Sequence, residues 1–408
     1  MLAQRAFRFL ALSALFLCSP LSFELRAEEP ADKPKTLAER APTPRSVEPP
    51  TILEIQQSLD RGLDFLIKSQ NKQGWWGSAT HTKDLNIYAP VPGAHHAFRS
   101  AVTALCVSAL VEAKSDRQDV AAAIDLGEAW MLEQLPKLRR ANGDALYNVW
   151  GHAYAIEAFA RLHAHRQADS AKQAELLRQM ALQVNLLERY ETVEGGWGYY
   201  DFKAQTQKPA GDPNSFTTAT MLYAFHRAQA LGVEVPQKLI DRGLAVIKRQ
   251  QRPDLSYLYG ADFKFNPGFD INKPGGSVGR SQVCNLVLRT YGDASVTDAA
   301  LKAWYERLFS RNLWLDIGRK RPIPHEAWFY VAGYFFYYGH YYAADGIELL
   351  PDSDRVPLQH QLARVMLKLQ EADGSWWDYP LYDYHQPYGT AFAIMTLKKC
   401  QPAAIPTK

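Results

Sequence analysis

The chain has 408 residues, of which 47% are hydrophobic and 22% are charged. A chain of this composition buries a sizeable core, which excludes a mainly disordered, collagen-like or small disulfide-stabilised protein. Its 46 Lys and Arg residues nearly balance its 43 Asp and Glu residues, and the net charge of +3 is too small for a protein that binds a phosphate backbone. We therefore expect no nucleic-acid partner.

The first 27 residues have the features of an export signal peptide. Arg5 and Arg8 lead into an apolar stretch, residues 9–18, which is too short to cross a bilayer as a helix. We expect cleavage after Ala27 and a periplasmic or secreted protein, with lipidation at Cys18 as the weaker alternative. No later segment is long and apolar enough to predict a transmembrane span.

Residues 28–50 contain six prolines among charged residues and almost no large apolar side chains. Such a segment buries too little surface to offset the entropy lost on ordering. We predict that it is a disordered Pro-rich linker. It is followed by one repeat domain, residues 51–400, and by a short tail, residues 401–408.

A repeated pattern begins at the start of this domain. Between Ile52 and Leu66 the apolar residues recur at spacings of three and four, which predicts an amphipathic helix, and Gln70, Gly74 and Trp76 follow it. Related residues recur at offsets that are close to two, three and five times 60 residues. These matches are Gly195 and Trp197 at an offset of 121, Gln251 and Tyr257 at 181, and Gln370, Gly374 and Trp376 at 300.

A second, more apolar helix follows each of these anchors. We place the two remaining units near Trp314 and around residues 134–143, which gives six helical hairpins. A hairpin cannot cover its own apolar face, so neighbouring hairpins must stack. We predict a closed ring of twelve helices, with an open superhelix as the competing geometry. The aligned first-turn positions of the six second helices are Thr103, His152, Thr218, Ser281, His340 and Thr390.

The string from Arg61 to Trp76 resembles the repeat motif of squalene and oxidosqualene cyclases. The matching residues are Arg61, Gly62, Phe65, Leu66, Gln70, Gly74 and Trp76. On this basis residues 51–400 resemble the prenyltransferase and squalene oxidase repeat family. The resemblance implies an all-α protein with the α/α toroid fold and an isoprenoid ligand.

The catalytic motifs of that family do not carry over to this sequence. Cyclases of the squalene-hopene type protonate their substrate from a D-x-D-D motif, and the nearest string, which runs from Asp352 to Arg355, reads as a helix N-cap. Protein prenyltransferases bind zinc through Asp, Cys and His. Here Cys284 matches, but Gln282 and Thr390 stand where Asp and His are needed. We therefore predict no metal and no cofactor, and leave open whether the protein is an enzyme.

Candidate catalytic residues gather where the second helices begin, because the free N–H groups and the long loops meet at that rim. His152 and His340 belong to units that face each other across the predicted ring. Two neutral imidazoles there would serve as acid and base, whereas purely local hydrogen bonding is the other interpretation. The candidate carboxylates of the rim loops are Asp201, Asp212, Asp378 and Asp383, of which we favour the last two.

Candidate ligand-binding residues are aromatic or basic side chains at the same rim. Tyr334 and Tyr338 belong to a stripe of tyrosines at helical spacing, which is typical of a packed core or of a cavity wall. The predicted ligand-binding residues are His96, Arg99, Trp150, Arg280, Tyr334, Tyr338 and Tyr388.

Three functions remain open from the sequence. The first is binding or transformation of an isoprenoid, the second is carbohydrate chemistry in an aromatic cleft, and the third is a non-catalytic scaffold. A cavity lined almost solely by aromatic rings would favour a lipid, two facing carboxylates would favour a sugar, and a filled centre would favour a scaffold. We expect a monomer that holds an apolar or sugar-like ligand in a central cavity, with at most peripheral contact with a membrane.

Overall fold

A computed structural model describes residues 35–83, 93–203, 206, 208–210 and 212–401. The chain divides into two units, residues 1–35 and residues 36–408, and the fold described below belongs to the second. The predicted signal peptide and all but the first residue of the predicted tail lie outside the described residues. No described helix is both long enough and apolar enough to cross a membrane.

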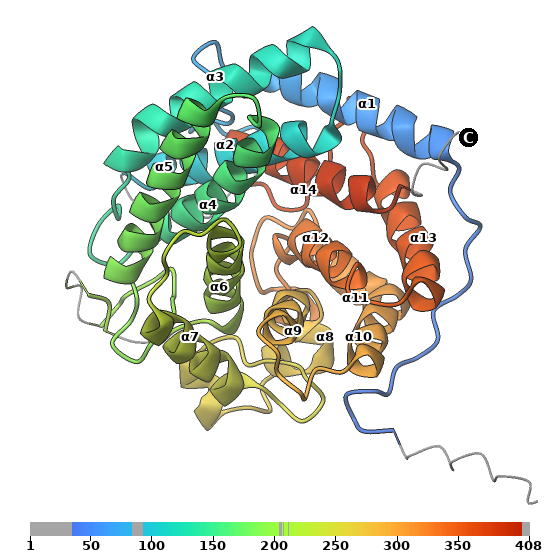
Figure 1. Cartoon of the computed structure of the whole chain (residues 1–408). Helices are drawn as coiled ribbons and strands as arrows, with labels where there is room; N and C mark the ends of the chain where they lie inside the picture. The colour runs from blue at the N-terminus through green and yellow to red at the C-terminus, as the bar shows by residue number, and fades with distance from the viewer. Residues whose placement is uncertain (1–34, 84–92, 204–205, 207, 211, 402–408) are drawn as a thin grey trace, which may run out of the picture. The chain divides into compact units, whose positions relative to one another are not determined.

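The second unit is a ring of helices in two layers (Figure 1). Each long helix of the outer layer is followed along the chain by one of the inner layer. The outer helices are α1 (Ile52–Ser69), α3 (Gln118–Gln134), α5 (Ser170–Arg189), α7 (Gln237–Gln250), α10 (Asp298–Ser310) and α13 (Asp352–Lys368). The inner helices are α2 (Ala94–Ala113), α4 (Asn148–His165), α6 (Ser215–Gln229), α9 (Arg280–Thr290), α12 (Phe335–Ile347) and α14 (His385–Lys399).

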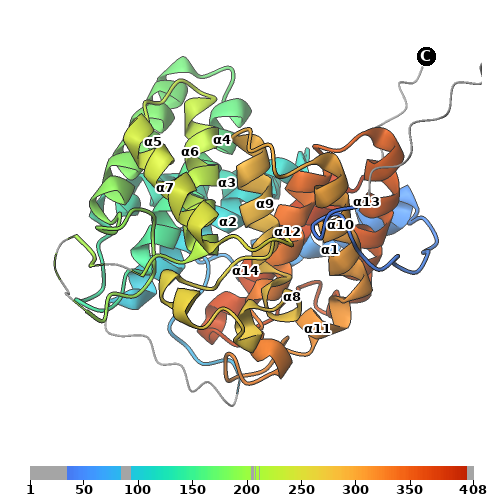
Figure 2. The ribbon, with the colours of Figure 1, turned by 90° about the horizontal axis from the view of Figure 1, so that it is seen from below.

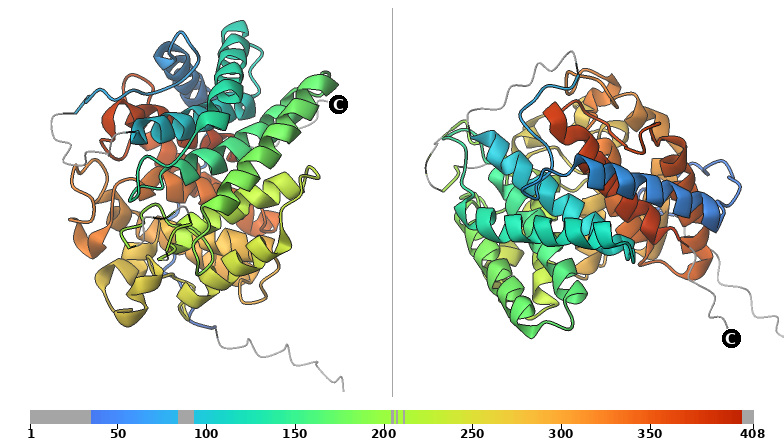
Figure 3. Two further views of the ribbon diagram at one scale, coloured as in Figure 1. Left: turned by 90° about the vertical axis from the view of Figure 1, so that its left-hand side faces the viewer. Right: turned by 90° about the horizontal axis from the view of Figure 1, so that it is seen from above.

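The inner layer closes on itself. Each inner helix packs against the next, and α14 packs against both α2 and α1, so the last hairpin meets the first (Figure 3). Among the described residues the inner helices therefore form a closed ring rather than an open superhelix. In the described part of the chain only isolated β-bridges occur besides helices and loops.

Sequence pattern explains the two layers. The outer helix α1 begins with a capping box, in which Thr51 and Glu54 satisfy each other's backbone N–H groups, and it buries only one face. In the inner helix α12, by contrast, every residue is buried. A helix that is apolar on all sides is stable only where other elements surround it, which is the position of the inner layer.

The long connections all run from an outer to an inner helix and so lie at one end of the ring (Figure 2). They carry the short helices α8 (Pro274–Ser277) and α11 (Asn312–Asp316). The opposite end has much shorter connections, such as residues 114–117 and 166–169. We call the end with the long connections the loop rim.

The predicted anchors make the same contacts in three hairpins. Each indole Nε1 donates to a carbonyl ten residues earlier, and the backbone N–H of the same Trp donates to the threonine hydroxyl at the aligned position of the inner helix. The indole acceptors are Leu66 for Trp76 (2.7 Å), Leu187 for Trp197 (2.9 Å) and Met366 for Trp376 (2.8 Å). The hydroxyl acceptors are Thr103 (3.2 Å), Thr218 (3.0 Å) and Thr390 (3.0 Å), in the same order.

Substitution of Gln70 tests the glutamine of this anchor. Its Nε2 donates to the carbonyl oxygens of Gly74 at 3.0 Å and of Ala123, in the neighbouring hairpin, at 2.9 Å. Because Gln70→Ala leaves both oxygens unpaired, we expect it to lower the free energy of unfolding by about 2 kcal/mol in urea denaturation. Gln73→Ala is the control, since that side chain is exposed and should change the value by less than about 0.5 kcal/mol. Equal effects of the two substitutions would contradict the role of Gln70.

Residues 36–50 of the predicted linker make hydrogen bonds to the helices of the ring. They run along the outer helices α10 and α13, where Arg307 donates to the carbonyl of Arg40 at 3.0 Å and Arg364 donates to that of Glu48 at 2.8 Å. The expectation of disorder counted only the apolar surface of the segment. Backbone carbonyls also gain stability from charged donors.

Candidate functional site

A cavity of about 690 Å³ opens inside the ring. Five of the inner helices and the loops of the loop rim contribute its wall. Seventeen of its 24 lining residues are Phe, Tyr or Trp, and none of the 24 is Asp, Glu, Lys or Arg. We call it the aromatic cavity. Its lining residues are Phe98, Ala101, Val102, Leu105, Tyr147, Trp150, Tyr154, Tyr199, Tyr200, Phe216, Tyr259, Phe263, Phe269, Ile271, Pro324, His325, Tyr330, Tyr334, Phe335, Tyr338, Tyr379, Leu381, Tyr388 and Phe392.

The phenol groups of this wall largely bind one another or a neighbouring side chain. The Tyr338 hydroxyl pairs with that of Thr220 at 2.8 Å, and the Tyr334 hydroxyl pairs with Nε2 of His325 at 2.9 Å. Hydroxyls engaged in this way leave mainly ring faces and edges for a ligand. Two further hydroxyl pairs are Tyr147 with Tyr200 and Tyr199 with Tyr259.

Asp378 is a buried carboxyl group just behind the wall. It accepts hydrogen bonds from the hydroxyl of Tyr388, whose ring lines the cavity, and from the backbone N–H of Tyr337 at 3.1 Å. Burial raises the pKa of Asp378 to about 7, because these two donors and the charge of Arg319 only partly offset the loss of water. Asp378 therefore titrates near neutral pH, and Tyr388 connects it to the cavity.

Solved structures share this arrangement of helices, although no family model and no curated protein matches the sequence. The cellobiose 2-epimerase from Spirochaeta thermophila DSM 6192 aligns over 86% of this chain and 96% of its own, with a TM-score of 0.54 and 15% identity. The GH76A alpha-1,6-mannanase from Salegentibacter sp. HEL1_6 aligns over 85% and 98%, with a TM-score of 0.53 and 9% identity. The chain has the α/α toroid fold.

The type II terpene cyclase MstE from Scytonema also aligns with the toroid, over 86% of this chain and 98% of its own. Its TM-score is 0.48 and its identity is 12%. Identities this low show a fold and no activity. The two alignments with TM-scores above 0.5 confirm the predicted fold class, and the function must be argued from the site.

Four of the predicted ligand-binding residues line the toroid's cavity. They are Trp150, Tyr334, Tyr338 and Tyr388. The aromatic side chains of Trp150 and Tyr338 meet edge to face, with 6.2 Å between their centroids, although they come from α4 and α12 on different sides of the toroid. Part of the tyrosine stripe is therefore cavity wall, the second of the two interpretations that its spacing allowed.

Arg280 supports the wall from behind rather than lining it. The buried guanidinium donates to the carbonyl oxygens of Gly276 at 2.6 Å and Tyr257 at 3.1 Å, and also to that of Ile271. It also lies over the ring of Tyr259 at 5.4 Å. Burial lowers the pKa of Arg280 to about 10, so the side chain remains charged at neutral pH. Arg280 thereby fixes the loop that carries Tyr259 and Ile271 into the wall.

We expect Arg280→Met to lower the free energy of unfolding by about 2–3 kcal/mol, because three buried carbonyls lose their donor. Chemical denaturation measures this loss. Arg189→Met, at an exposed position at the end of α5, is the matched control and should be nearly neutral. A neutral Arg280→Met would show that the loop holds its position without the guanidinium.

The two histidines that we expected to face each other do not line the aromatic cavity. His152 pairs through Nδ1 with Gln183 of α5 at 2.7 Å, and His340 pairs through Nε2 with Asn312 at 2.8 Å. Burial lowers the pKa of both imidazoles to about 4, so both are neutral at physiological pH. Their partners agree with the local hydrogen bonding that the sequence left open.

The remaining predicted residues also lie away from the wall. His96 is half-buried, with its pKa lowered by burial, and Arg99 lies over the ring of Trp75 at 4.8 Å. The carboxylate of Asp383 accepts a hydrogen bond from Ser78 at 3.1 Å. None of the four candidate carboxylates of the loops lines the aromatic cavity, so no two of them face each other across it.

His325 is a wall residue that the sequence did not single out. Its backbone has a φ of 65°, its Nδ1 pairs with the carbonyl oxygen of Tyr330 at 2.7 Å, and its Nε2 pairs with Tyr334. Burial lowers its pKa, so it acts as a neutral hydrogen-bonding group. The only available signal was the length of the loop between α10 and α12, which is typical of a functional loop.

Proposed function

We propose that this toroid binds an elongated, uncharged, isoprenoid-type ligand in the aromatic cavity. The observation that supports this most strongly is the composition of the wall, which has seventeen aromatic rings and no carboxylate, ammonium or guanidinium group among its 24 residues. Burial of apolar ligand surface against such a wall supplies binding energy of about 25 cal/mol per Å². The volume lies within the range of sites that enclose small ligands.

The absence of charged side chains among the 24 lining residues also favours a ligand without a charged head group. A diphosphate taken out of water needs cations and hydrogen-bond donors to offset its desolvation. Arg280 comes near the wall, but its guanidinium donates to backbone carbonyls behind it. A prenyl alcohol, hydrocarbon or sterol fits this environment, and a prenyl diphosphate does not.

Carbohydrate chemistry receives less support from the site. The similar solved structures include a cellobiose 2-epimerase and an alpha-1,6-mannanase, but this likeness extends only to the fold. Glycoside hydrolysis ordinarily needs two carboxyl groups on either side of the bond that breaks. Asp378 lies behind Tyr388, and none of the 24 described lining residues supplies a carboxylate to face it. Sugar binding is therefore an alternative outcome of the experiment below.

Tryptophan fluorescence titration tests the proposal, with farnesol, farnesyl diphosphate and cellobiose as probes. We expect farnesol to bind, and the other two to bind at least about tenfold more weakly. Trp150→Ala removes a large ring from the wall and should weaken farnesol binding about tenfold. Trp130→Ala is the matched control, because Trp130 packs against Trp75 in the outer layer at 6.1 Å and should leave affinity unchanged.

Calorimetry of the Trp150→Ala and Trp130→Ala variants provides a readout that does not depend on their changed fluorescence. Native mass spectrometry of the protein from its own host adds a second test, for which we expect a retained sterol-like or polyprenyl mass. Binding of cellobiose with no binding of farnesol would overturn the proposal in favour of the carbohydrate function.

A further inference from the structure

The inner helices stack their side chains in layers along the bore of the toroid. At three of the six aligned positions the hydroxyls of Thr103, Thr218 and Thr390 contact the Trp turns, whereas residues two places before and after the aligned positions contribute to the cavity wall. Five of the six residues two places earlier line the cavity: Ala101, Trp150, Phe216, Tyr338 and Tyr388. The residues two places later form the next layer, which we call the floor layer: Leu105, Tyr154, Thr220, Val283, Tyr342 and Phe392.

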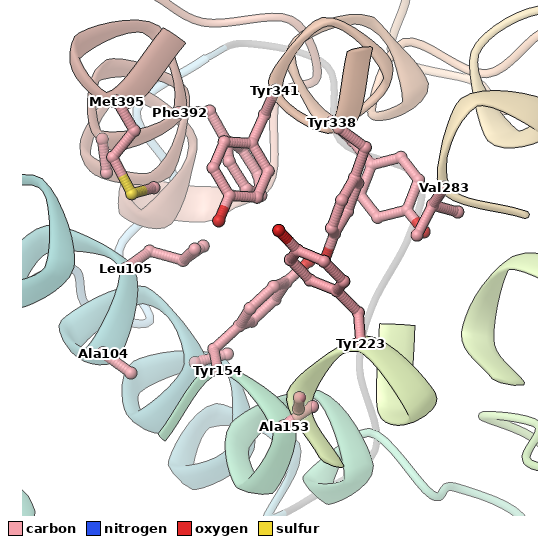
Figure 4. Packing of buried hydrophobic residues seen from close by; sticks show 14 of the residues in the cluster. Ala104, Leu105, Ala153, Tyr154, Tyr223, Val283, Tyr338, Tyr341, Phe392 and Met395 are labelled. Carbon is pink, nitrogen blue, oxygen red and sulfur yellow. The ribbon is translucent and has the colours of Figure 1, made fainter. Parts of the chain in front are cut away.

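The floor layer closes the deep end of the aromatic cavity. Leu105, Tyr154 and Phe392 are its members in the cavity wall, and Figure 4 shows their side chains converging from α2, α4 and α14. The ring of Phe392 lies between two tyrosines, edge to face with Tyr154 at 6.0 Å and tilted against Tyr341 at 5.1 Å. Phe392 is only 4% exposed, so its ring fills the space between these neighbours.

Charged residues lie beyond the floor layer, on the side away from the cavity. An apolar ligand that extended past the floor layer would have to displace them from their partners at a cost in free energy. The Tyr341 hydroxyl donates to Glu157 at 2.9 Å and accepts from Arg161 at 2.9 Å. Lys399 pairs with the buried carboxylate of Asp345 at 2.8 Å. An alkyl chain that reached this level would strip these groups of their partners, which costs several kcal/mol. The aromatic cavity is therefore closed at this end.

We infer that the floor layer limits the length of the ligand and that Phe392 is the residue that determines it. This inference rests on the proposed function. Phe392 is suited to the role because its ring has no polar atom, so its removal deepens the cavity without leaving a hydrogen-bonding group unpaired. Tyr341 beneath it is held by Glu157 and Arg161, so the layer below stays in place when the ring is removed.

The test compares farnesol with geranylgeraniol, which is longer by one isoprene unit, by calorimetric titration of the full chain. We expect Phe392→Ala to shift the ratio of the two Kd values at least about tenfold in favour of the longer alcohol, because the extra unit becomes buried. Leu105→Phe should shift the ratio the other way, since it adds a ring to the same layer. Phe225→Ala is the matched control, because Phe225 is equally buried but packs against Trp197 at 5.5 Å, outside the cavity wall.

The outcomes separate the two proposals. Absence of binding by the native chain to either alcohol overturns the proposed function. Binding by the native chain with an unchanged ratio in Phe392→Ala overturns the role of the floor layer alone. Thermal unfolding identifies variants that do not fold, and if Phe392→Ala is one of them, Phe392→Leu and Leu105→Phe decide the question by the same ratio.

Discussion

Replacing Lys399 with methionine is expected to lower the free energy of unfolding by about 3–5 kcal/mol, which is large compared with the total stability of a typical domain. Lys399 lies 2.8 Å from Asp345, whose side chain is only 2% exposed. Burial raises the pKa of Asp345, but Lys399 and Arg227 outweigh it and hold the pKa below its usual value, so the carboxylate is charged. Without Lys399 this buried charge loses its nearest partner. Urea denaturation at pH 7 measures the loss.

Two controls make this prediction specific. The double variant Asp345→Asn, Lys399→Met should recover part of the lost stability, because the most deeply buried charge is removed together with its partner. Glu112 and Glu348, the other partners of Lys399, are more exposed than Asp345. Lys368→Met, at an exposed position in the last turn of α13, should change stability by less than about 0.5 kcal/mol. A double variant as unstable as the single one would show that the unpaired charge of Asp345 does not cause the loss.

Replacing Asp378 with asparagine is expected to change how stability depends on pH. Because burial raises the pKa of Asp378 to about 7 from 3.8, the folded protein binds a proton that the unfolded chain has lost between these pH values. Stability of the native protein therefore falls as pH rises from about 4 to about 7. Three pKa units correspond to roughly 4 kcal/mol. The Asn variant lacks this dependence and should gain about that much relative to the native protein between pH 4 and pH 8.

Urea denaturation at pH 4, 6 and 8 provides the measurement. Asp373→Asn, in the same hairpin, is a control of opposite sign. Burial raises the pKa of Asp373, but hydrogen bonds from Ser375 and Gln386 outweigh burial and hold the pKa below its usual value of 3.8. The charged form of Asp373 therefore stabilises the folded state at pH values above 3.8. Parallel pH profiles for the native protein and Asp378→Asn would show that Asp378 ionises freely in the folded state.

The fold could be predicted because its determinants are local and recur along the chain. Gln70, Gly74 and Trp76 mark the end of an outer helix, and their contacts recur in the last hairpin at Gln370, Gly374 and Trp376. Closure followed from the number of hairpins and from the need of each to cover an apolar face. The contacts of residues 36–50 did not follow, because they depend on donors such as Arg307 that lie far away in the sequence.

The site could be predicted only in part, because alignment gives the height of a residue along the bore and not the direction of its side chain. His152 and His340 stand at the height of Thr103 and Thr390, whose hydroxyls face the Trp turns rather than the axis. The side chains that reach the axis lie two residues away, as Trp150, Tyr338 and Tyr388 do. The loop residues of the wall have no such period, so no alignment pointed to His325 or Tyr259.

Closure of the inner layer also gives the hairpin of α1 and α2 a neighbour on both sides, as the later hairpins have. Because α14 packs against α1 and α2 much as other neighbours pack, every hairpin has a partner on both sides. A circular permutant that joined the two ends and opened the chain at a short connection, such as residues 114–117, would retain all of these interfaces. The packing of the ring therefore does not depend on which hairpin comes first along the chain.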